Sequence, residues 1–299
     1  MSDSRRVGWG VLGAANIARR AVLEAIAASP NGRLVAMASR NPERAREMLA
    51  PYPEARVLNS YEALLADPLV DAVYNPLPNN LHREWTVRAL EAGKHVLCEK
   101  PIALNAAEAE EMAAAASAAG RHLMEAFMYR FHPAMRELVA GSRDAIRVEA
   151  SFGFSVKDAA DIRVQPRLGG GALLDVGCYT VSVARWILGE PDRVYARSRI
   201  HNGVDGTTSA LLHFPSGSTA SIWCSIESSE IQAVTVITRD AVHRRDRAFN
   251  FRQDPDDPYR LMVESFGESV LDDRAVEIPL SESIANMRVL DQIREAARA

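Results

Sequence analysis

The run Cys98-Glu99-Lys100-Pro101 places a carboxylate and an ammonium side by side, directly after the apolar segment 95–98. That segment is typical of a buried strand, and in open α/β sheets ligands bind outside the carboxyl ends of the strands. An ammonium at such an edge can polarise an oxygen of a bound substrate. A strand-end lysine is more often simply solvated, so the prediction that Glu99 and Lys100 line a site depends on the other motifs.

A second group of reactive side chains follows the three glycines of segment 169–171. Asp175 and Tyr179 are four residues apart there, which places both on one face of a helix. With Lys100 they supply an ammonium, a carboxylate and a phenol, enough to hold a secondary alcohol and move its proton while a hydride leaves the carbon. The simpler alternatives are a core tyrosine and a helix-terminal acid. We predict that these three residues are catalytic and that no metal is required.

A glycine fingerprint for a dinucleotide lies at the first strand-to-helix turn. Gly8, Gly10 and Gly13 match G-x-G-x-x-G literally, but that phase places two glycines inside the strand, where no phosphate could reach them. In the phase Gly13-x-Ala15-x-x-Ala18, Gly13 makes the tight turn and Ala15 lies nearest the diphosphate. The small Ala18 then allows close packing of the helix on the strand. The methyl group of Ala15, where glycine is usual, could weaken binding. The predicted contacts of this turn are Gly13, Ala15, Asn16 and Ile17.

The end of the second predicted strand indicates which dinucleotide binds. An acidic residue there would accept hydrogen bonds from a free ribose 2′-hydroxyl, but the chain has Ser39 and Arg40. A hydroxyl and a guanidinium suit a 2′-phosphate, because arginine offers paired donors and no acceptor. We therefore predict NADP rather than NAD, although a solvated Arg40 is the simpler alternative.

Strand-like and helix-like segments alternate over the first 126 residues, which predicts a Rossmann domain with a doubly wound parallel sheet. Asn41 is expected to cap a helix that Pro42 opens. The predicted strands are 7–12, 34–39, 56–58, 70–74, 95–98 and 122–126, and the predicted helices are 17–29, 42–49, 61–66, 82–92 and 103–120.

Beyond about residue 140 polar and apolar residues alternate in longer runs, which predicts antiparallel strands with one buried face. The chain is therefore α/β, with a Rossmann domain at 1–126 and a C-terminal α/β domain at 127–299 on a large, mostly antiparallel, open-faced sheet. Helix 172–188 would cover one face, and the C-terminal helix could pack back on the first domain. We expect the open face to form a homodimer or homotetramer. The predicted strands are 146–154, 194–198, 207–214, 219–226 and 231–238, with a hairpin turn at 214–218.

Composition excludes several classes of partner. A net charge of -4 and a pI near 6.0 argue against binding to nucleic acid or to an anionic membrane. The three cysteines lack C-x-x-C pairing, so neither a disulfide framework nor a zinc site is expected, which fits a reducing cytoplasm. No apolar run reaches the roughly 18 residues of a membrane span.

Taken together, the motifs resemble the glucose-fructose oxidoreductase, inositol dehydrogenase and rhizopine-catabolism (Gfo/Idh/MocA) family over almost the whole chain. The resemblance implies that Lys100 and Tyr179 flank the reacting carbon and that Asp175 supports them. Tyr179 with Ser39-Arg40 is most similar to the branch of NADP-dependent D-xylose 1-dehydrogenases and trans-1,2-dihydrobenzene-1,2-diol dehydrogenases. The matching stretches are the Gly13 turn, 75–82, 99–101, 125–133 and 169–179.

The resemblance also implies an activity and further contacts. The activity is NADP-dependent hydride transfer to or from a carbon of a small sugar or cyclic polyol or diol. The implied substrate residues are Tyr129, Arg130 and His132, and the residues implied to line the nicotinamide and ribose are Pro76, Leu77, Asn80, His82, Glu99 and Lys100.

Two alternatives stay open. One is an NADPH-dependent reductase of an anhydrofructose-like keto-sugar, because sequence does not set the direction of the reaction. The other is a dinucleotide-binding regulator without turnover, which the retention of Lys100, Asp175 and Tyr179 disfavours. Segment 228–259 is shorter than relatives usually carry, and its arginine-rich part 239–252 lacks a strand pattern. Pocket shape and subunit geometry therefore stay open.

Overall fold

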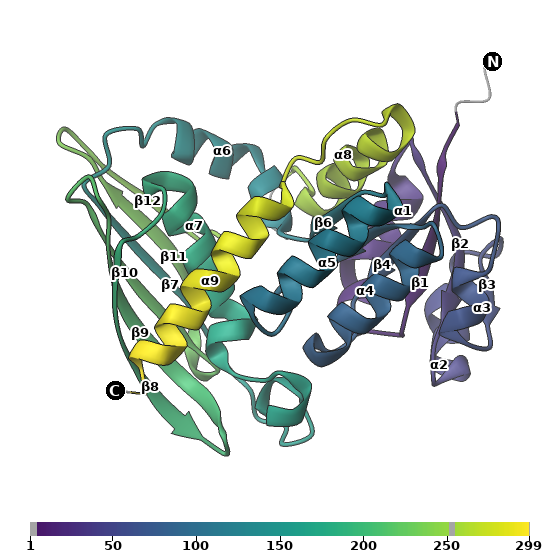
Figure 1. Cartoon of the computed structure of the whole chain (residues 1–299), viewed down its shortest axis with the longest axis horizontal. Helices are drawn as coiled ribbons and strands as arrows, with labels where there is room; N and C mark the ends of the chain where they lie inside the picture. Colours follow the sequence, from purple (N-terminus) through teal and green to yellow (C-terminus); the bar gives the residue numbers. More distant parts are fainter. Residues whose placement is uncertain (1–4, 251–254, 299) are drawn as a thin grey trace. The chain divides into compact units, whose positions relative to one another are not determined.

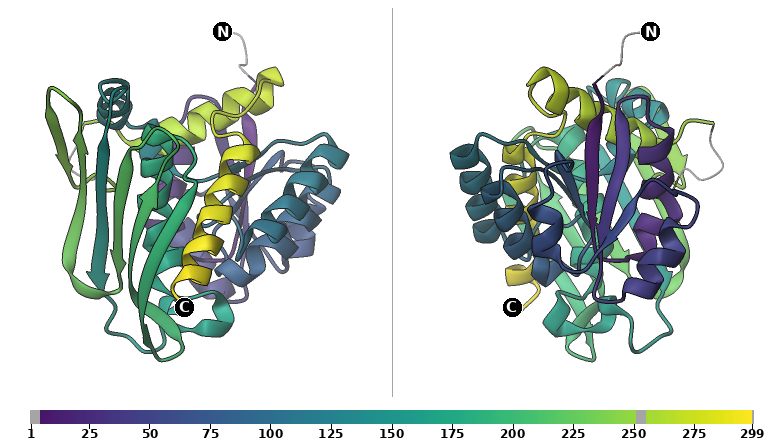
Figure 2. Two further views of the ribbon diagram at one scale, coloured as in Figure 1. Left: turned by 60° about the vertical axis from the view of Figure 1, so that its left-hand side comes forward. Right: turned by 90° about the vertical axis from the view of Figure 1, so that its right-hand side faces the viewer.

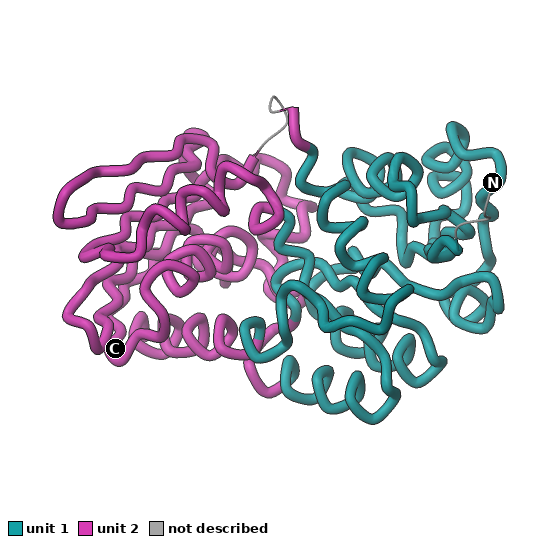
Figure 3. The backbone as a smooth tube through the Cα atoms, turned by 90° about the horizontal axis from the view of Figure 1, so that it is seen from above, with its two compact units in different colours: residues 1–102, 108–128, 257–283 teal, residues 103–107, 129–256, 284–299 magenta. Residues whose placement is uncertain are grey.

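The computed structural model describes residues 5–250 and 255–298. They form two compact units, coloured teal and magenta in Figure 3. The first unit consists of Met1–Ile102, Glu108–Met128 and Asp257–Ser283, and the second of Ala103–Ala107, Tyr129–Asp256 and Ile284–Ala299.

The first unit is built on a six-stranded parallel sheet with the order β3-β2-β1-β4-β5-β6. This is the strand order of a doubly wound Rossmann sheet, in which the order reverses between β1 and β4. The predicted fold class of the N-terminal half is confirmed. The strands are β1 (Val7–Leu12), β2 (Gly32–Ala38), β3 (Arg56–Leu58), β4 (Ala72–Asn75), β5 (His95–Cys98) and β6 (Leu123–Glu125).

Helices cover both faces of this sheet, with α4 and α5 on one side and α1 and α8 on the other (Figures 1 and 2). Helix α2 begins as predicted, since Pro42 opens it and the Asn41 side chain accepts from the backbone N–H of Arg44 at 3.0 Å. The helices are the π-helical turn η1 (Ala18–Val22), α1 (Leu23–Ala28), α2 (Pro42–Leu49), α3 (Tyr61–Leu65), the 3₁₀ turn η2 (Asn79–Leu81), α4 (His82–Glu91), α5 (Ala106–Ala119) and α8 (Pro258–Asp272).

Helix α8 joins the first unit from far along the chain. The Asn31 side chain donates to the backbone carbonyl of Glu264 at 2.8 Å, and the rings of Trp9 and Phe266 lie 5.6 Å apart. Gly267 faces the Asn31 amide so closely that a Cβ would lie 2.8 Å from its oxygen. The helix therefore completes the core beside β1.

The second unit is built on a six-stranded sheet with the order β12-β11-β7-β10-β9-β8. Its pairs are antiparallel except for the parallel pair of β7 and β10. The prediction of a mostly antiparallel sheet is confirmed. The strands are β7 (Arg147–Ser155), β8 (Arg193–His201), β9 (Val204–His213), β10 (Thr219–Ser225), β11 (Glu227–Ile237) and β12 (Val242–Asp246).

The arginine-rich segment contains a strand that the sequence pattern did not reveal. β12 pairs antiparallel with β11 at the edge of the sheet, where its side chains are exposed or half-buried. An edge strand without a buried face needs no apolar alternation, which explains the missing signal. Residues 251 and 252, at the end of this segment, lie outside the described residues.

Helix α7 lies against one face of the second sheet, as predicted for segment 172–188 (Figure 2). In the described part of the chain no helix covers the opposite face, where Tyr195 and Val242 are 56% and 67% exposed. The helical elements are the 3₁₀ turns η3 (Met128–Phe131), η4 (Ile162–Val164) and η5 (Pro166–Leu168), the π-helical turn η6 (Leu173–Gly177), α6 (Pro133–Ala140), α7 (Cys178–Leu188) and α9 (Leu280–Ala296).

One helical stretch of the described residues, Pro166–Leu188, is long and apolar enough to cross a membrane. Of its most apolar window, 83% is buried inside the protein. The Asn286 side chain of α9 donates to the carbonyl of Cys178 within this stretch at 3.2 Å. Its apolar character is that of a core helix.

Two histidines meet at the amino ends of β5 and β6. The backbone N–H of His122 donates to Nδ1 of His95 at 3.0 Å, and the two rings stack 5.1 Å apart. Burial, followed by the charges of His122 and Arg121, lowers the pKa of His95 to about 4. Nδ1 must be unprotonated to accept that hydrogen bond, so the fold requires the neutral ring.

We predict that this requirement makes the protein less stable in mild acid. Between the unfolded pKa near 6.5 and the folded pKa of about 4, the unfolded chain binds a proton at His95 that the folded chain does not. The free energy of unfolding should therefore fall on acidification from pH 7 to pH 5, by at most about 1.4 kcal/mol per pH unit from this site. Guanidinium denaturation at several pH values measures it.

The matched variants are His95→Asn, which keeps an acceptor that does not titrate, and His201→Asn at an exposed position. The first should reduce the slope of the free energy of unfolding against pH, leaving the part contributed by the buried His82, and the second should leave the slope unchanged. Equal slopes in wild type and His95→Asn would contradict the prediction.

Candidate functional site

The predicted cofactor residues of the first unit lie at one edge of its sheet. Strands β1, β2, β4 and β5 are parallel, so their carboxyl ends meet at the same edge. Each strand is followed there by predicted residues. They are Gly13 after β1, Ser39 and Arg40 after β2, Pro76 and Leu77 after β4, and Glu99 and Lys100 after β5.

The glycine turn has the conformation that its predicted role requires. Gly13 has φ +77°, a left-handed value that favours glycine, and its N–H donates to the carbonyl of Ala38 at 2.7 Å. A Cβ on Gly13 would lie 2.9 Å from Cδ2 of Leu77. The turns after β1 and β4 thus approach each other closely, and the next helix starts with the π-helical turn η1.

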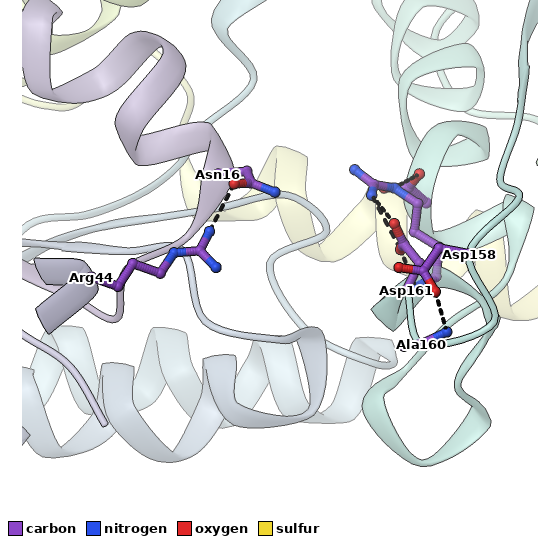
Figure 4. A network of polar contacts seen from close by, with 7 residues as sticks. Asn16, Arg44, Asp158, Ala160 and Asp161 are labelled. Atoms are coloured by element: carbon purple, nitrogen blue, oxygen red, sulfur yellow. Dashed lines mark hydrogen bonds and ion pairs between the residues drawn. The ribbon is translucent and has the colours of Figure 1, made fainter. Parts of the chain in front are cut away.

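Two guanidinium groups are held at the end of β2. Arg40 hydrogen-bonds to the hydroxyl of Tyr61, and its charge lowers the pKa of that phenol while burial, the larger effect, raises it. Arg44 donates to Oδ1 of Asn16 at 2.7 Å, which links α2 to the glycine turn (Figure 4). Sequence reasoning found Arg40 but missed Arg44 and Tyr61. The available signal was that Arg44 lies four residues after Arg40, in the first turn of the helix that Pro42 opens.

His82 connects two loops of this edge. Its ring is fully buried, with Nδ1 2.8 Å from the carbonyl of Pro101 and Nε2 2.7 Å from the carbonyl of Leu77. The two carbonyls favour a protonated ring, but burial outweighs them and lowers the pKa of His82 to about 4. The neutral ring donates through one nitrogen. Asn75 supports the same loop, accepting from the N–H of Leu77 at 3.3 Å.

The backbone around Lys100 is held by buried acids as well. Glu99 accepts a hydrogen bond from the hydroxyl of Tyr74 at 2.6 Å, and Glu125, which is fully buried, accepts from the N–H of Ile102 at 2.9 Å. The Lys100–Pro101 peptide bond between them is cis. The lysine thus extends from a segment fixed on both sides.

Asp175 of the second unit lies in η6, and its carboxylate pairs with a residue that sequence reasoning missed. Arg163 Nε donates to Oδ2 of Asp175 at 2.8 Å, and the same guanidinium reaches Asp161 at 3.2 Å. Figure 4 labels Asp161 in this network. Asp175 is the main cause that raises the pKa of Arg163 above its ordinary value. Arg163 lies in the short 3₁₀ turn η4, which has no periodic pattern, so no sequence signal marked it.

Tyr179, in the first turn of α7, lies among aromatic rings. Its ring centroid is 5.6 Å from that of Tyr129, 5.4 Å from Phe152 and 5.4 Å from Phe249. Its own ring is only 7% exposed. The phenol therefore has little rotational freedom.

The predicted substrate residues make contacts within this unit. The hydroxyl of Tyr129 donates to Ser182 at 2.8 Å, and burial raises the pKa of Tyr129. The guanidinium of Arg130 lies 4.6 Å from the ring centre of Trp186, and His132 accepts from the N–H of Ala134 at 3.2 Å, capping α6. Lys100 belongs to the first unit, whereas Asp175 and Tyr179 belong to the second.

Two family models match the chain. The oxidoreductase family with an NAD-binding Rossmann fold (Gfo/Idh/MocA) matches residues 7–127, and the Gfo/Idh/MocA C-terminal domain matches residues 134–242. The change from one to the other precedes β7, the first strand of the second sheet.

Several relatives are similar over most of their length. The chain is 40% identical to D-xylose 1-dehydrogenase (NADP(+)) 2 of Haloferax volcanii, over 97% of each chain. It is 39% identical to trans-1,2-dihydrobenzene-1,2-diol dehydrogenase of Mus musculus, over 74% of this chain and 69% of the relative.

The chain is also similar in structure to solved oxidoreductases. An aldose-aldose oxidoreductase from Caulobacter crescentus, complexed with glycerol, has a TM-score of 0.91 at 28% identity, over 98% of each chain. A 3-ketoreductase from Actinomadura kijaniata, in complex with NADP and TDP-benzene, has a TM-score of 0.86 at 30% identity, again over 98% of each chain.

We predict that His82→Leu destabilises the first unit, because a buried carbonyl loses its donor. The expected loss is about 2–3 kcal/mol in the free energy of unfolding. Guanidinium denaturation measures it, with His201→Leu on an exposed strand as the control. A loss no larger than that of the control would show that the link between the two loops contributes nothing.

Proposed function

Because the chain belongs to the Gfo/Idh/MocA family of oxidoreductases, we propose that it transfers a hydride between NADP and a carbon of a sugar or cyclic diol. It is an NADP-dependent oxidoreductase that acts on CH–OH or keto groups. The named substrates of its relatives, D-xylose and a dihydrobenzene diol, support a small polyhydroxylated substrate.

The residues at the carboxyl edge of the first sheet fit NADP. The positive φ of Gly13 leaves room for a close approach to the turn, and Arg40 and Arg44 supply donors where a 2′-phosphate would bind. Oδ1 of Asn80 is buried without a hydrogen-bond partner among the described residues, which suits a donor of the ligand. We assign the cofactor to Gly13, Ala15, Asn16, Ile17, Ser39, Arg40, Pro76, Leu77, Asn80, Glu99 and Lys100, with His82 acting through the loops that it joins.

When bound, NADP accepts the hydride in oxidation or NADPH donates it in reduction. In oxidation the proton of the substrate hydroxyl passes to the ionised phenol of Tyr179 and from there to solvent, while the C–O bond becomes a carbonyl. The ammonium of Lys100 stabilises the negative charge on that oxygen. The carboxylate of Asp175, held by Arg163, accepts a hydrogen bond from a substrate hydroxyl. Tyr129, whose ring packs against that of Tyr179, contributes to the substrate pocket together with Arg130 and His132 of the same segment.

The observation that carries this proposal is the anchoring of the segment that bears Lys100. Solvated lysines need no fixed backbone, whereas this one follows Glu99, which is bonded to Tyr74, and precedes Pro101, which is bonded to His82. Such support is expected where an ammonium must meet a reacting oxygen.

A panel of aldoses and cyclic diols with NADP, and of keto-sugars with NADPH, tests the proposal. Turnover of an aldose or diol supports a dehydrogenase. Faster turnover of a keto-sugar supports the reductase, which the named activity of the 3-ketoreductase relative favours. Tight binding of NADPH, followed by fluorescence, without turnover of any substrate would support the regulator and overturn the enzyme assignment.

We propose that the open face of the second sheet forms a homodimer or homotetramer in the cytoplasm. Exposed apolar side chains on that face, among them Tyr195, Ile231 and Val242, support a protein partner. All three cysteines are free and buried, which fits a reducing compartment. Light scattering of the purified protein tests the assembly.

Removing either reactive group should abolish most of the turnover. We predict that Lys100→Met and Tyr179→Phe each lower kcat by at least ~100-fold, the scale of losing a general acid or base. NADP affinity should change much less. Lys157→Met and Tyr52→Phe are the matched controls, and wild-type rates in both active-site variants would refute the assignment.

Exchanging the charge at the end of β2 should change the choice of cofactor. We predict that Arg40→Asp reverses the preference for NADP over NAD, because a carboxylate repels the 2′-phosphate and accepts from a free 2′-hydroxyl. Comparison of kcat/KM with the two cofactors measures it. Arg46→Asp, an exposed site in α2, should keep the preference. An unchanged ratio in Arg40→Asp would remove the reason for assigning the phosphate contact to this residue.

A further inference from the structure

The three glycines before η6 are explained by close contacts within the second unit. Gly169 and Gly171 have positive φ values of 78° and 118°. A Cβ on Gly170 would lie 2.5 Å from the carbonyl oxygen of Arg163, and one on Gly171 would lie 2.1 Å from Oδ1 of Asp205. The space that a side chain at 171 would need is therefore filled by a carboxylate from β9.

Asp205 bonds to the first turn of the segment that bears the proposed reactive groups. Its Oδ2 accepts from the backbone N–H of Leu173 at 2.7 Å and from the hydroxyl of Thr208 at 3.0 Å. Residue Ala172, at the capping position of η6, contributes no side-chain cap. The backbone N–H of Leu173, at the start of the helix, has no acceptor within the helix and donates instead to a carboxylate from β9.

The segment that Asp205 holds is a π-helical turn, which is wider than an α-helix and is frequently found at functional sites. It contains Asp175 and continues into α7 with Tyr179. Gly177 brings its far end against β10, since a Cβ there would lie 3.0 Å from Sγ of Cys224. Both ends of the turn are therefore fixed to the sheet.

The charge of Asp205 matters for this contact. Burial raises its pKa above the ordinary value, while the hydrogen bonds from Leu173 and Thr208 and the charge of Arg294 lower it. An ionised carboxylate at a helix N-terminus is stabilised by the helix dipole and accepts a stronger hydrogen bond than an amide would.

We infer that Asp205 is a positioning residue: by binding the N–H of Leu173 in the space left by Gly171, it sets the π-helical turn that directs Asp175 relative to Tyr179. The inference rests on the proposed function, in which those two side chains contact the substrate. Asp205 itself acts through the backbone.

The test combines two readouts on Asp205→Asn, which is nearly isosteric. Amide hydrogen exchange of the segment 173–179 needs no substrate, and we expect it to become at least about tenfold faster, because the loss of one charge-assisted hydrogen bond is of order 1.4 kcal/mol. In turnover we expect kcat to fall about tenfold with KM and NADP affinity within about twofold, as for a small displacement of reactive groups. Thr208→Val, which removes the second donor, should give a smaller change of the same kind.

A double-mutant cycle isolates the contact itself. Gly171→Ala should be far more damaging to the free energy of unfolding in the wild type than in an Asp205→Ala background, where the Cβ has room. Gly189→Ala is the matched control, because Gly189 ends the same helix with φ +83° and has no atom within 4 Å of its added Cβ. Its cost should be the same in both backgrounds.

The outcomes separate the two proposals. Unchanged hydrogen exchange in Asp205→Asn and in Thr208→Val, or additive effects of Gly171→Ala and Asp205→Ala, would overturn the positioning role. Faster exchange with kcat unchanged, or with NADP affinity reduced as much as kcat, would also overturn it. A wild-type protein without turnover on the whole panel would overturn only the proposed function, since the exchange and stability measurements would still report on Asp205.

Discussion

The backbone from Glu99 to Ile102 is held by polar groups buried from solvent, and the role proposed for Lys100 depends on that constraint. A lysine side chain is long and flexible, so its ammonium has a defined place only if the chain beneath it is fixed. The holding groups come from β4, α4 and β6, through Tyr74, His82 and Glu125. A change in any of these elements should therefore alter the position of the Lys100 ammonium.

The second unit fixes its proposed reactive groups by different means. Asp175 is paired with a guanidinium, Tyr179 is packed among aromatic rings, and the start of their helix is bonded to a strand. In both units a glycine turn leads directly into a π-helical turn, Ala18–Val22 in the first and Leu173–Gly177 in the second. A π-helical turn adds one residue to the helix and so changes the direction in which the following side chains point. This suits sites where the direction of a side chain matters.

Much of the fold follows from patterns in the sequence. Short apolar runs between amphipathic segments predicted the parallel sheet, longer alternating runs predicted the second sheet, and Gly13 has the turn conformation expected of it. The edge strand β12 has no buried face and so gives no pattern. Roles that depend on side-chain reach across loops, such as those of Arg44 and Arg163, also leave no periodic trace. A π-helical turn adds one residue to a helix, too little to alter a 3.6-residue period.

Helix α8 has a consequence for how the protein is made. It packs beside β1 through Trp9 and Phe266, yet it is encoded after the entire second sheet. The entire second sheet must therefore be synthesised before the core of the first unit can close. Until then the apolar side of β1 and α1 that α8 covers stays exposed, and uncovered apolar surface of this kind favours aggregation.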